Sequence, residues 1–561
     1  MIASTRQSKV IFMRKPPFMT SQIKFNADSY RDKITFMKRL IYQIATSTFI
    51  LILSIATTHK AFGQDGPPSP EDMMAMMVKL AAADAPRGLI VNTKGATKGY
   101  KLFAPLTSDI YYLINNEGEV VHTWKLKYAA GTAYIMDNGN LIASGRDPVS
   151  VVFAGGGQSG YLFEYDWDGN LLWEYKYSTD AHLIHHDIAV MPNGNILAIT
   201  WQAKTAEECM RIGRKPKNTP KDGLWPDSVI EIEPEKPSGG RIVWEWHMWD
   251  HMIQNFDENM PNYGDPAEHP ELIDINLGEP LKRITEEELA GRKAIGFAAS
   301  TSTVDNEGSD MYHCNAIAYN AELDQIAISS PGMNEIFIID HSTNAAESSG
   351  HAGGKYSHGG DLLYRWGNPQ NYGRGTEDDE VLHEQHDVQW IPAGSPGAGH
   401  LTIFNNTAGG GPHGPHSAAI EIIPPMNDDG SYQTPASGPF GPAETVWEYK
   451  APEPSAMFAP FISSVERLTN GNTLISVGPQ GRFFEVTPEN EIVWEYWMPY
   501  YGDIRIADGT TAQPIGPFHY AAFRVNHFGP KHPAFEGRKM KPIKPQPDVP
   551  QTPRPPLPPG H

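Results

Sequence analysis

One short element recurs six times along the 561 residues and limits what the chain can fold into. Each copy is an apolar run that ends in a Trp with an acidic or aromatic neighbour. A second element, Asn-Gly between alternating apolar residues, predicts β-hairpins in which both turn residues adopt positive φ. The repeated Trp residues are Trp124, Trp173, Trp244, Trp366, Trp447 and Trp494, and the turns lie at Asn138-Gly139, Asn193-Gly194 and Asn470-Gly471.

Each repeat has room for four strands, which is the pattern of a β-propeller blade. The fold class that we expect is all-β, a six-bladed β-propeller. Its sixth blade is split, with outer strands from residues 100–124 and an inner strand from 519–525, so that N- and C-terminal strands close the ring and remove an open sheet edge. A β-sandwich array or two separate domains is the alternative. The five continuous blades span 131–177, 186–247, 313–367, 386–450 and 463–498.

Some segments lie outside the repeat. An insertion of about residues 250–312 interrupts it, and Thr285 with Glu288 predicts a capping box at the start of a short helix there. The C-terminal tail is rich in Pro and Lys and is predicted to be disordered. The expected organisation is an upstream segment with a signal peptide over 1–63, a linker over 64–88, the propeller over 89–530 and the tail over 531–561.

The N-terminal region has the features of an export signal. Met37-Lys38-Arg39 is followed by an apolar run from Leu40 to Ala56 and then by Ala61-Phe62-Gly63. This order of basic, apolar and small residues is that of a cleavable secretory signal. We therefore expect a periplasmic or secreted protein that starts near Gln64 and has no membrane attachment in its mature form. The alternative is an N-terminal anchor, since about 17 apolar residues is the lower limit for a membrane span.

Charge limits the binding partners that we expect, and cysteine content limits the disulfides. The formal net charge of −21 repels phosphate backbones and anionic lipids, so nucleic acid is not an expected partner. A small anionic substrate would need a local basic pocket. The 2 cysteines, Cys209 and Cys314, could pair in an oxidising compartment but do not form a disulfide framework.

Histidines recur at one position of the innermost strand. Alignment of the blades places His186, His313, His386 and His519 there. Innermost strands line the central channel, so these side chains are expected to meet at one mouth of the ring. Clustered imidazoles repel each other when protonated, which argues against histidines that only fill the channel. Four other histidines in neighbouring loops, which we expect at the solvated surface, are His185, His251, His383 and His416.

Two kinds of chemistry fit such a cluster. The histidines can act as nucleophile and acid–base partners without a cofactor. Alternatively, His186, His313 and His386 can be ligands of a divalent transition metal in a lyase or hydrolase, with Asp187 and Asp387 behind them. A third alternative is a binding propeller with no catalytic activity.

Over roughly residues 90–530 the chain resembles the PAPS-independent arylsulfate sulfotransferases of bacterial periplasms, which are six-bladed propellers. The resemblance implies transfer of a sulfuryl group from an aryl sulfate ester to a phenol through a sulfated histidine, with no nucleotide cofactor. It implies that His386 is the nucleophile and that His186 and His313 stabilise charged oxygens or relay protons. The residues that carry it are His185–Ile188 with Pro192–Asn195, His313–Tyr319 with Ile326–Ser330 and Glu335–Asp340, and Gln385–Val388 with Leu401–Asn405.

The chain departs from the family pattern at one position. An arginine follows the two serines of the third blade in the family, whereas this chain has Ser329-Ser330-Pro331. Loss of a guanidinium from an anion site is costly unless another cation replaces it. Arg524 is the first candidate, because it shares the predicted closing strand with His519. The substrate-binding residues that we expect are Arg524, His519 and Arg365.

Overall fold

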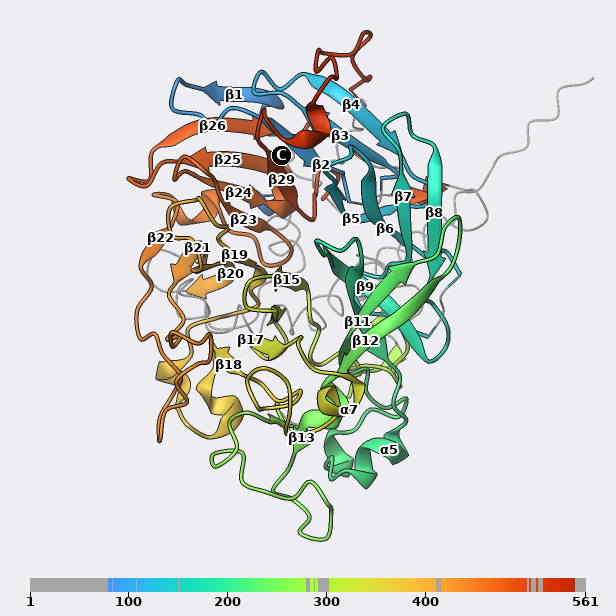
Figure 1. The fold of residues 1–561 in the computed structure, drawn as a ribbon, viewed down its shortest axis with the longest axis vertical. Helices are drawn as coiled ribbons and strands as arrows, with labels where there is room; N and C mark the ends of the chain where they lie inside the picture. The colour runs from blue at the N-terminus through green and yellow to red at the C-terminus, as the bar shows by residue number, and fades with distance from the viewer. Residues whose placement is uncertain are drawn as a thin grey trace, which may run out of the picture.

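Six antiparallel β-sheets lie around a common axis, so the predicted six-bladed propeller is confirmed (Figure 1). The structure is a computed structural model. It describes residues 79–549, except positions 83, 107 and 287 and the segments 150–151, 279–282, 291–301, 410–414, 502–503, 506–510 and 513–517. The predicted upstream segment and signal peptide therefore lie outside the described residues.

The strands of each blade run from the axis outward. Blade 1 has β5 (Ala130–Ile135), β6 (Leu141–Arg146), β7 (Gly160–Tyr165) and β8 (Leu171–Lys176); blade 2 has β9 (His182–Val190), β10 (Ile196–Gln202), β11 (Asp227–Pro234) and β12 (Gly240–His247); blade 3 has β15 (Ala316–Asn320), β16 (Gln325–Ser330), β17 (Glu335–Asp340) and β18 (Tyr364–Trp366). Blade 4 has β19 (His386–Trp390), β20 (Leu401–Gly409), β21 (His416–Ile422) and β22 (Trp447–Tyr449); blade 5 has β23 (Ser464–Arg467), β24 (Thr473–Val477), β25 (Arg482–Val486), β26 (Ile492–Trp497) and β1 (Gly88–Asn92); blade 6 has β29 (Val525–Phe528), β2 (Tyr100–Phe103), β3 (Ile110–Ile114) and β4 (Val120–Lys125).

Short elements lie in the connections within and between the blades and in the tail. Residues Thr285 and Glu288 form the predicted capping box, with the Glu288 amide donating to Thr285 Oγ1 at 3.1 Å. The connecting elements are α5 (Ala206–Arg211), α7 (Ala345–Ser348), the strand pairs β13 (Met252–Ile253) with β14 (Ile273–Asp274) and β27 (Ile504–Arg505) with β28 (Thr511–Ala512), and the 3-10 turns η1 (Pro216–Asn218), η2 (Met248–His251), η3 (Pro369–Tyr372), η4 (Glu377–Asp379), η5 (Pro454–Ala456), η6 (Gly478–Gln480) and η7 (Pro533–Phe535).

The repeated Trp residues lie on the fourth strand of each blade, counted from the axis. Trp124 and Trp173 are two that form a hydrogen bond to the next blade. The Trp173 indole N–H of blade 1 donates to the Gly239 carbonyl of blade 2 at 2.7 Å. In the same way, Trp124 of blade 6 donates to Asp166 O of blade 1 at 3.0 Å. The recurrence of Trp along the sequence therefore reflects a contact that is repeated between neighbouring blades.

The N- and C-terminal strands close the ring as predicted. Strand β29 pairs antiparallel with β2, with Phe528 opposite Tyr100 and Val525 opposite Phe103. The innermost strand begins at Val525, so the segment from His519 to Arg524 precedes it rather than forming it. In addition, β1 pairs with β26 as a fifth strand of blade 5, which the sequence did not predict.

Two terminal segments pack more closely than expected. Part of the predicted linker lies against the propeller, because Leu80 and Ala81 are buried beside Phe458. The prediction of a disordered tail from 531 is wrong for residues 531–549. Phe535 is buried in the core, and the Ile543 amide donates to the Val120 carbonyl at 2.9 Å. The tail covers the outer edge of blade 6, which gives its few apolar residues a partner.

The Asn-Gly hairpins have a different turn geometry from the one expected. Only the glycine has positive φ, with 90° at Gly139. The asparagine instead accepts a hydrogen bond from the amide two residues later, as between Asn138 Oδ1 and the Asn140 amide at 2.8 Å. The turn is therefore fixed by an asparagine side chain that mimics the backbone.

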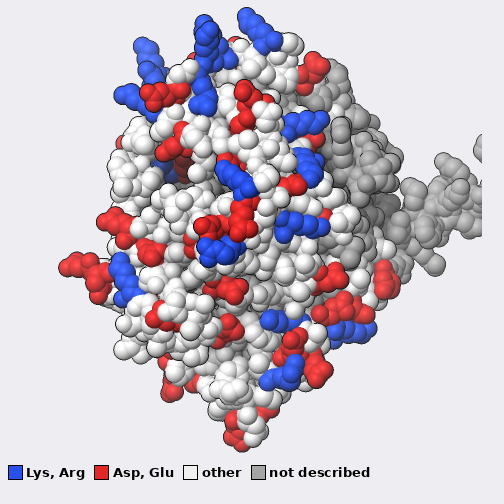
Figure 2. All heavy atoms as spheres, turned by 45° about the vertical axis from the view of Figure 1, so that its right-hand side comes forward, with Lys and Arg blue, Asp and Glu red and all other residues white. Residues whose placement is uncertain are grey.

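The surface carries charges of both signs. Figure 2 shows Lys and Arg side chains intermixed with Asp and Glu across the face in view. The negative net charge is therefore not gathered into one patch on this face. Within the described part of the chain, no helix has the length and apolar character needed to cross a bilayer. Cys209 and Cys314 are buried free thiols.

Candidate active site

Three histidines lie on or beside neighbouring innermost strands. His186 is in β9, His313 precedes β15 and His386 begins β19, and β15 contacts both β9 and β19. The ladder shifts register opposite His186 and again after His386, which marks a bulge in each inner strand. The backbone has positive φ at His186 (51°), His313 (52°) and Asp387 (59°). Such conformations are costly for non-glycine residues and are frequent at functional sites.

His186 and His313 are in direct contact. Their ring centroids lie 4.5 Å apart, with the rings nearly perpendicular. The loop at Gly157 packs on the His186 ring, because a Cβ at Gly157 would lie 2.3 Å from it. Only glycine allows the backbone to approach the imidazole this closely.

A second histidine, His185, is in hydrogen-bond contact with His186. His185 Nδ1 lies 2.8 Å from His186 Nδ1, and His185 Nε2 lies 2.9 Å from Asp227 Oδ1. The His185 ring is stacked on Trp201 at 3.9 Å. His185 is fully buried, so the expectation that it lies at the surface is wrong. It is a residue of the site that the sequence analysis missed, although its position next to His186 was a signal.

The pKa of His186 lies well below its usual value. Burial is the main cause, and electrostatic repulsion from the neighbouring imidazoles and from Arg524 adds to it. His186 is therefore a neutral imidazole at neutral pH.

The pKa of His313 is shifted in the opposite direction. Burial by itself would lower the pKa of His313, but the carboxylate of Asp310 raises it above its usual value. Asp310 Oδ2 lies 2.5 Å from His313 Nδ1. The side chain of His313 is 27% exposed, so its other ring edge remains accessible. The pair Asp310–His313 therefore places a histidine of raised pKa beside the neutral His186, and burial raises the pKa of Asp310 as well.

His386 is neutral with its tautomer fixed. Burial is the main cause that lowers the pKa of His386 to about 3. His386 Nδ1 lies 2.9 Å from Asn406 Oδ1 and 3.0 Å from the Glu384 carbonyl, and both of these groups are acceptors. The Asn406 amide is itself oriented, because its Nδ2 donates to the Ala459 and Ile462 carbonyls. Nδ1 therefore carries the proton, and the Nε2 lone pair accepts from the Ile462 amide at 3.1 Å.

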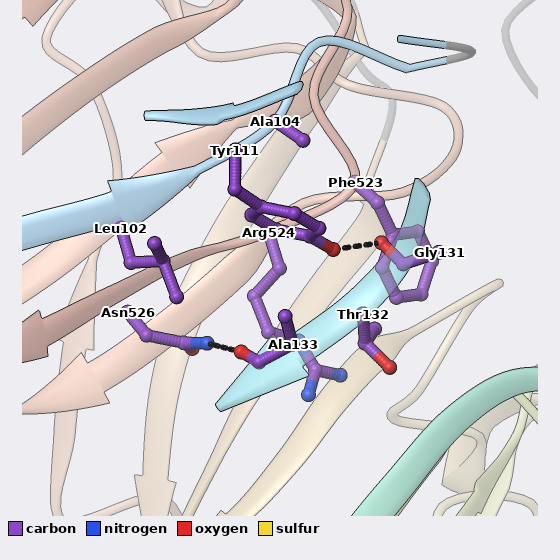
Figure 3. Close-up of a pocket in the computed structure, with 9 residues that line it drawn as sticks. All are labelled: Leu102, Ala104, Tyr111, Gly131, Thr132, Ala133, Phe523, Arg524 and Asn526. Carbon is purple, nitrogen blue, oxygen red and sulfur yellow. Dashed lines mark hydrogen bonds between the residues drawn. The ribbon is translucent and has the colours of Figure 1, made fainter. Parts of the chain in front are cut away.

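Arg524 lies at the axis, but its charge is already paired. Its guanidinium contacts Asp187 Oδ2 at 2.9 Å and Asp387 Oδ1 at 2.8 Å, and it donates to Tyr134 Oη at 2.7 Å. Figure 3 shows Arg524 bordering a small pocket between blades 6 and 1, with Tyr111 and Phe523. The side chain of Arg524 is 5% exposed.

The two aspartates also tie blades together. Asp187 Oδ2 accepts from the Ile317 amide of blade 3 at 3.1 Å. Asp387 Oδ2 accepts from the Val465 amide of blade 5 at 2.8 Å. Both terminal nitrogens of Arg524 thus join these inter-blade contacts, so the guanidinium that was predicted to clamp a sulfate is bound to two carboxylates.

The structure does not bring the other two predicted substrate-binding residues to this cluster. Arg365 is on β18, the outermost strand of blade 3, where it is fully buried and bound to Glu335 and to the carbonyls of Pro270 and Leu272. His519 lies in a turn before β29, with its ring 6.2 Å from that of Tyr501. Both were placed near the site by sequence position, which does not report side-chain direction.

The alternative metal site is not assembled in this structure. In the part of the chain that is described, one group of three metal-binding side chains has its ligand atoms within 4.8 Å of one another, and it does not include His186, His313 or His386. Asp187 and Asp387, which were expected behind the metal ligands, bind Arg524 instead.

Fold and site together define a β-propeller protein with a histidine cluster at its axis. The family model of the arylsulfotransferases (ASST) matches residues 103–497, and the chain belongs to this family. The match covers all but the first strands and the closing strand of the propeller.

Solved structures show more distant similarity. A protein of unknown function from Bacteroides caccae has 10% identity and a TM-score of 0.38 over 76% of this chain and 98% of its own. The periplasmic gluconolactonase of Pseudomonas aeruginosa has 9% identity and a TM-score of 0.36 over 76% and 98%. Virginiamycin B lyase from Staphylococcus aureus has 12% identity and a TM-score of 0.33 over 74% and 85%. No curated protein matches the chain in sequence.

Proposed function

We propose that this protein transfers a sulfuryl group from an aryl sulfate to a phenol through a transiently sulfated His386. Membership of the arylsulfotransferase family supports the reaction class. The observation that carries the proposal is the pattern of pKa shifts in the cluster, in which burial keeps His386 and His186 neutral whereas Asp310 raises the pKa of His313. A nucleophile must be unprotonated, whereas the leaving oxygen needs a proton donor.

The first half of the reaction forms a nitrogen–sulfur bond. His386 Nε2 gives up its hydrogen bond from the Ile462 amide and attacks the sulfur, and the bond between the sulfur and the aryl oxygen breaks. The leaving oxygen takes the proton from His313, and the freed Ile462 amide donates to a sulfuryl oxygen. Asn406 holds the proton on His386 Nδ1 and so keeps the lone pair on Nε2.

The second half returns the cluster to its starting state. An acceptor phenol gives its proton to His313, its oxygen attacks the sulfur, and the bond to His386 Nε2 breaks. No nucleotide is consumed. Pro331 has no donor at the position of the family arginine, and His313, held by Asp310, supplies the donor to the substrate instead.

We also propose that the protein acts in the periplasm. The family is typically periplasmic, and the sequence predicts an export signal upstream of the propeller.

Incubation with 4-nitrophenyl sulfate in the absence of an acceptor tests the proposal. Mass spectrometry of the protein should show the gain of one sulfuryl group on the peptide that contains His386. His386→Asn should abolish the gain and lower kcat by about a thousandfold. His383→Gln, a partly exposed neighbour outside the cluster, should behave like wild type. Release of nitrophenol with the group on His186 would move the nucleophile, and no turnover at all would overturn the proposal.

A further inference from the structure

A second histidine cluster lies far from the axis, at the outer edge of blades 2 and 3. His251 ends the turn η2 that follows β12, and Asp361 precedes β18. His251 Nδ1 lies 2.7 Å from Asp361 Oδ1, and His351 Nδ1 lies 2.8 Å from the same oxygen. His251 is fully buried, Asp361 is buried and the His351 side chain is 62% exposed. The expectation that His251 lies at the surface is therefore wrong.

The hydrogen bonds of this cluster point to a bound cation. His251 Nε2 lies 2.9 Å from the Ser348 carbonyl, so Nε2 must carry a proton. A neutral His251 then has its lone pair on Nδ1, directed at a carboxylate oxygen that also has lone pairs. The same oxygen meets the Nδ1 of His351. His351 can donate to this oxygen from Nδ1 as a neutral tautomer, whereas His251 needs either a second proton or a metal ion between its Nδ1 and the oxygen.

The backbone around His251 is built to hold its ring in place. Trp246 is stacked parallel to the His251 ring at 5.7 Å, and its indole N–H donates to the Gly360 carbonyl at 2.7 Å. A Cβ at Gly360 would lie 2.6 Å from His251 Nε2, so the ring packs directly on the backbone. A histidine whose far nitrogen donates to a carbonyl is the usual orientation of a metal ligand.

We propose that His251, His351 and Asp361 form a site for a divalent transition metal such as Zn²⁺. Two imidazoles and a carboxylate are a common protein ligand set for Zn²⁺. Bonds of about 2.0–2.1 Å in a tetrahedral site place ligand atoms about 3.3 Å apart, so Asp361 Oδ1 needs to move about 0.5 Å away from each imidazole nitrogen. His351 can adjust to this movement of Asp361, because its side chain is mostly exposed. Water or an anion from solvent takes the fourth position on the exposed side.

The metal would join two blades. His251 follows the outermost strand of blade 2, whereas His351 and Asp361 belong to the long connection between β17 and β18 of blade 3, which includes α7 (Figure 1). The same two blades are linked at this edge by the Ser348 hydroxyl, which donates to the Glu245 carbonyl at 2.7 Å. The ion adds a further link across 110 residues of sequence between His251 and Asp361.

Metal titration of the full chain tests the site. Protein that has been treated with a chelator and dialysed should bind one Zn²⁺ at this site. Competition with a chromophoric indicator measures the affinity. His351→Ala should weaken that binding by at least about tenfold. Co²⁺ in place of Zn²⁺ should give the intense visible absorption of a four-coordinate site, and the same variant should lose it.

His269→Ala is the matched control, because His269 is also an exposed histidine next to a carboxylate and is outside the cluster. It should bind Zn²⁺ like wild type. Asp361→Asn, which keeps the side-chain shape, should match His351→Ala. Absence of bound Zn²⁺, or binding that is equally strong in wild type and in both cluster variants, would overturn the proposal.

Discussion

The axial histidines differ in pKa because their partners differ. Burial keeps His386 neutral, with a pKa of about 3, and Asn406 fixes its tautomer. At His313 the carboxylate of Asp310 outweighs burial and raises the pKa. Groups of opposite protonation state in one site are typical of acid–base catalysis, because each role needs its own pKa. The adjacent residues of the site, rather than the histidines themselves, therefore decide which one holds the proton.

Asp310→Asn should change the pH dependence of aryl sulfate cleavage. The proposed acid, His313, is protonated below its raised pKa, so the rate falls as pH increases through that value. Loss of the carboxylate lowers the pKa of His313, and the alkaline limb of kcat/KM should move to lower pH by about one unit. Profiles between about pH 5 and pH 10 measure the shift.

Asp324→Asn is the control, because Asp324, together with Glu231, raises the pKa of a histidine outside the site, His341. Its alkaline limb should stay at the wild-type position. A folded Asp310→Asn protein with an unchanged profile would exclude His313 as the acid.

Arg524→Met should destabilise the fold strongly. The substitution leaves Asp187 and Asp387 buried without their shared cation, and such a loss costs about 3–5 kcal/mol in the free energy of unfolding. Urea unfolding measures it. Arg241→Met, which removes an exposed ion pair with Glu233, should cost less than about 1 kcal/mol. Similar losses in the two variants would show that Arg524 does not hold the blades together.

At the scale of strands, the inner and the outer strands of a blade shift their hydrogen-bond register at different residues. The innermost strands β9 and β19 shift register beside their histidines. The fourth strands β8, β12 and β26 shift register next to their repeated Trp. A bulge bends its strand and redirects a side chain. The inner bulges thus accompany the site, whereas the outer ones accompany the contact to the next blade.

Trp173→Phe and Trp447→Phe are compared at this scale, and Trp173 is fully buried whereas Trp447 is partly exposed. Trp173 donates to the Gly239 carbonyl of the next blade, whereas the Trp447 indole N–H has no hydrogen-bond partner in the described structure. Loss of the bond and of buried volume should reduce the free energy of unfolding by about 1–3 kcal/mol for Trp173→Phe. Trp447→Phe should cost less. Equal effects in denaturant titrations would contradict this order.

At the scale of the whole molecule, both ends of the chain close the ring. Strand β29 from the C-terminal end forms the inner strand of blade 6, and β1 from the N-terminal end covers the edge of blade 5. The tail then continues over blade 6, with Arg538 lying 4.8 Å from the ring of Trp167. Unfolding of the ring therefore requires that these terminal contacts open.

A chain that ends at Pro530 should be less stable than the full chain. It keeps β29 but loses buried Phe535 and the bonds of Ile543 and Gln546 to Val120. Burial of Phe535 alone is worth about 2 kcal/mol, so the thermal midpoint should fall by several degrees. A chain that ends at Pro550 keeps all of these contacts and should melt like the full chain. Equal midpoints for the two truncations would show that the tail contributes no stability.

The sequence alone determined the number of blades, the recurrence of their Trp residues and the equivalent positions of His186, His313 and His386, because a repeat places similar residues at similar sites. Only the tertiary structure decided the partners of those residues. Arg524 could face a substrate or two carboxylates, and its pairing with Asp187 and Asp387 depends on strands more than a hundred residues apart. His185 and His251 were expected at the surface, but the fold buries both. Local pattern indicates which strand a residue joins, whereas charge, protonation and ligand geometry are set by neighbours that the pattern does not contain.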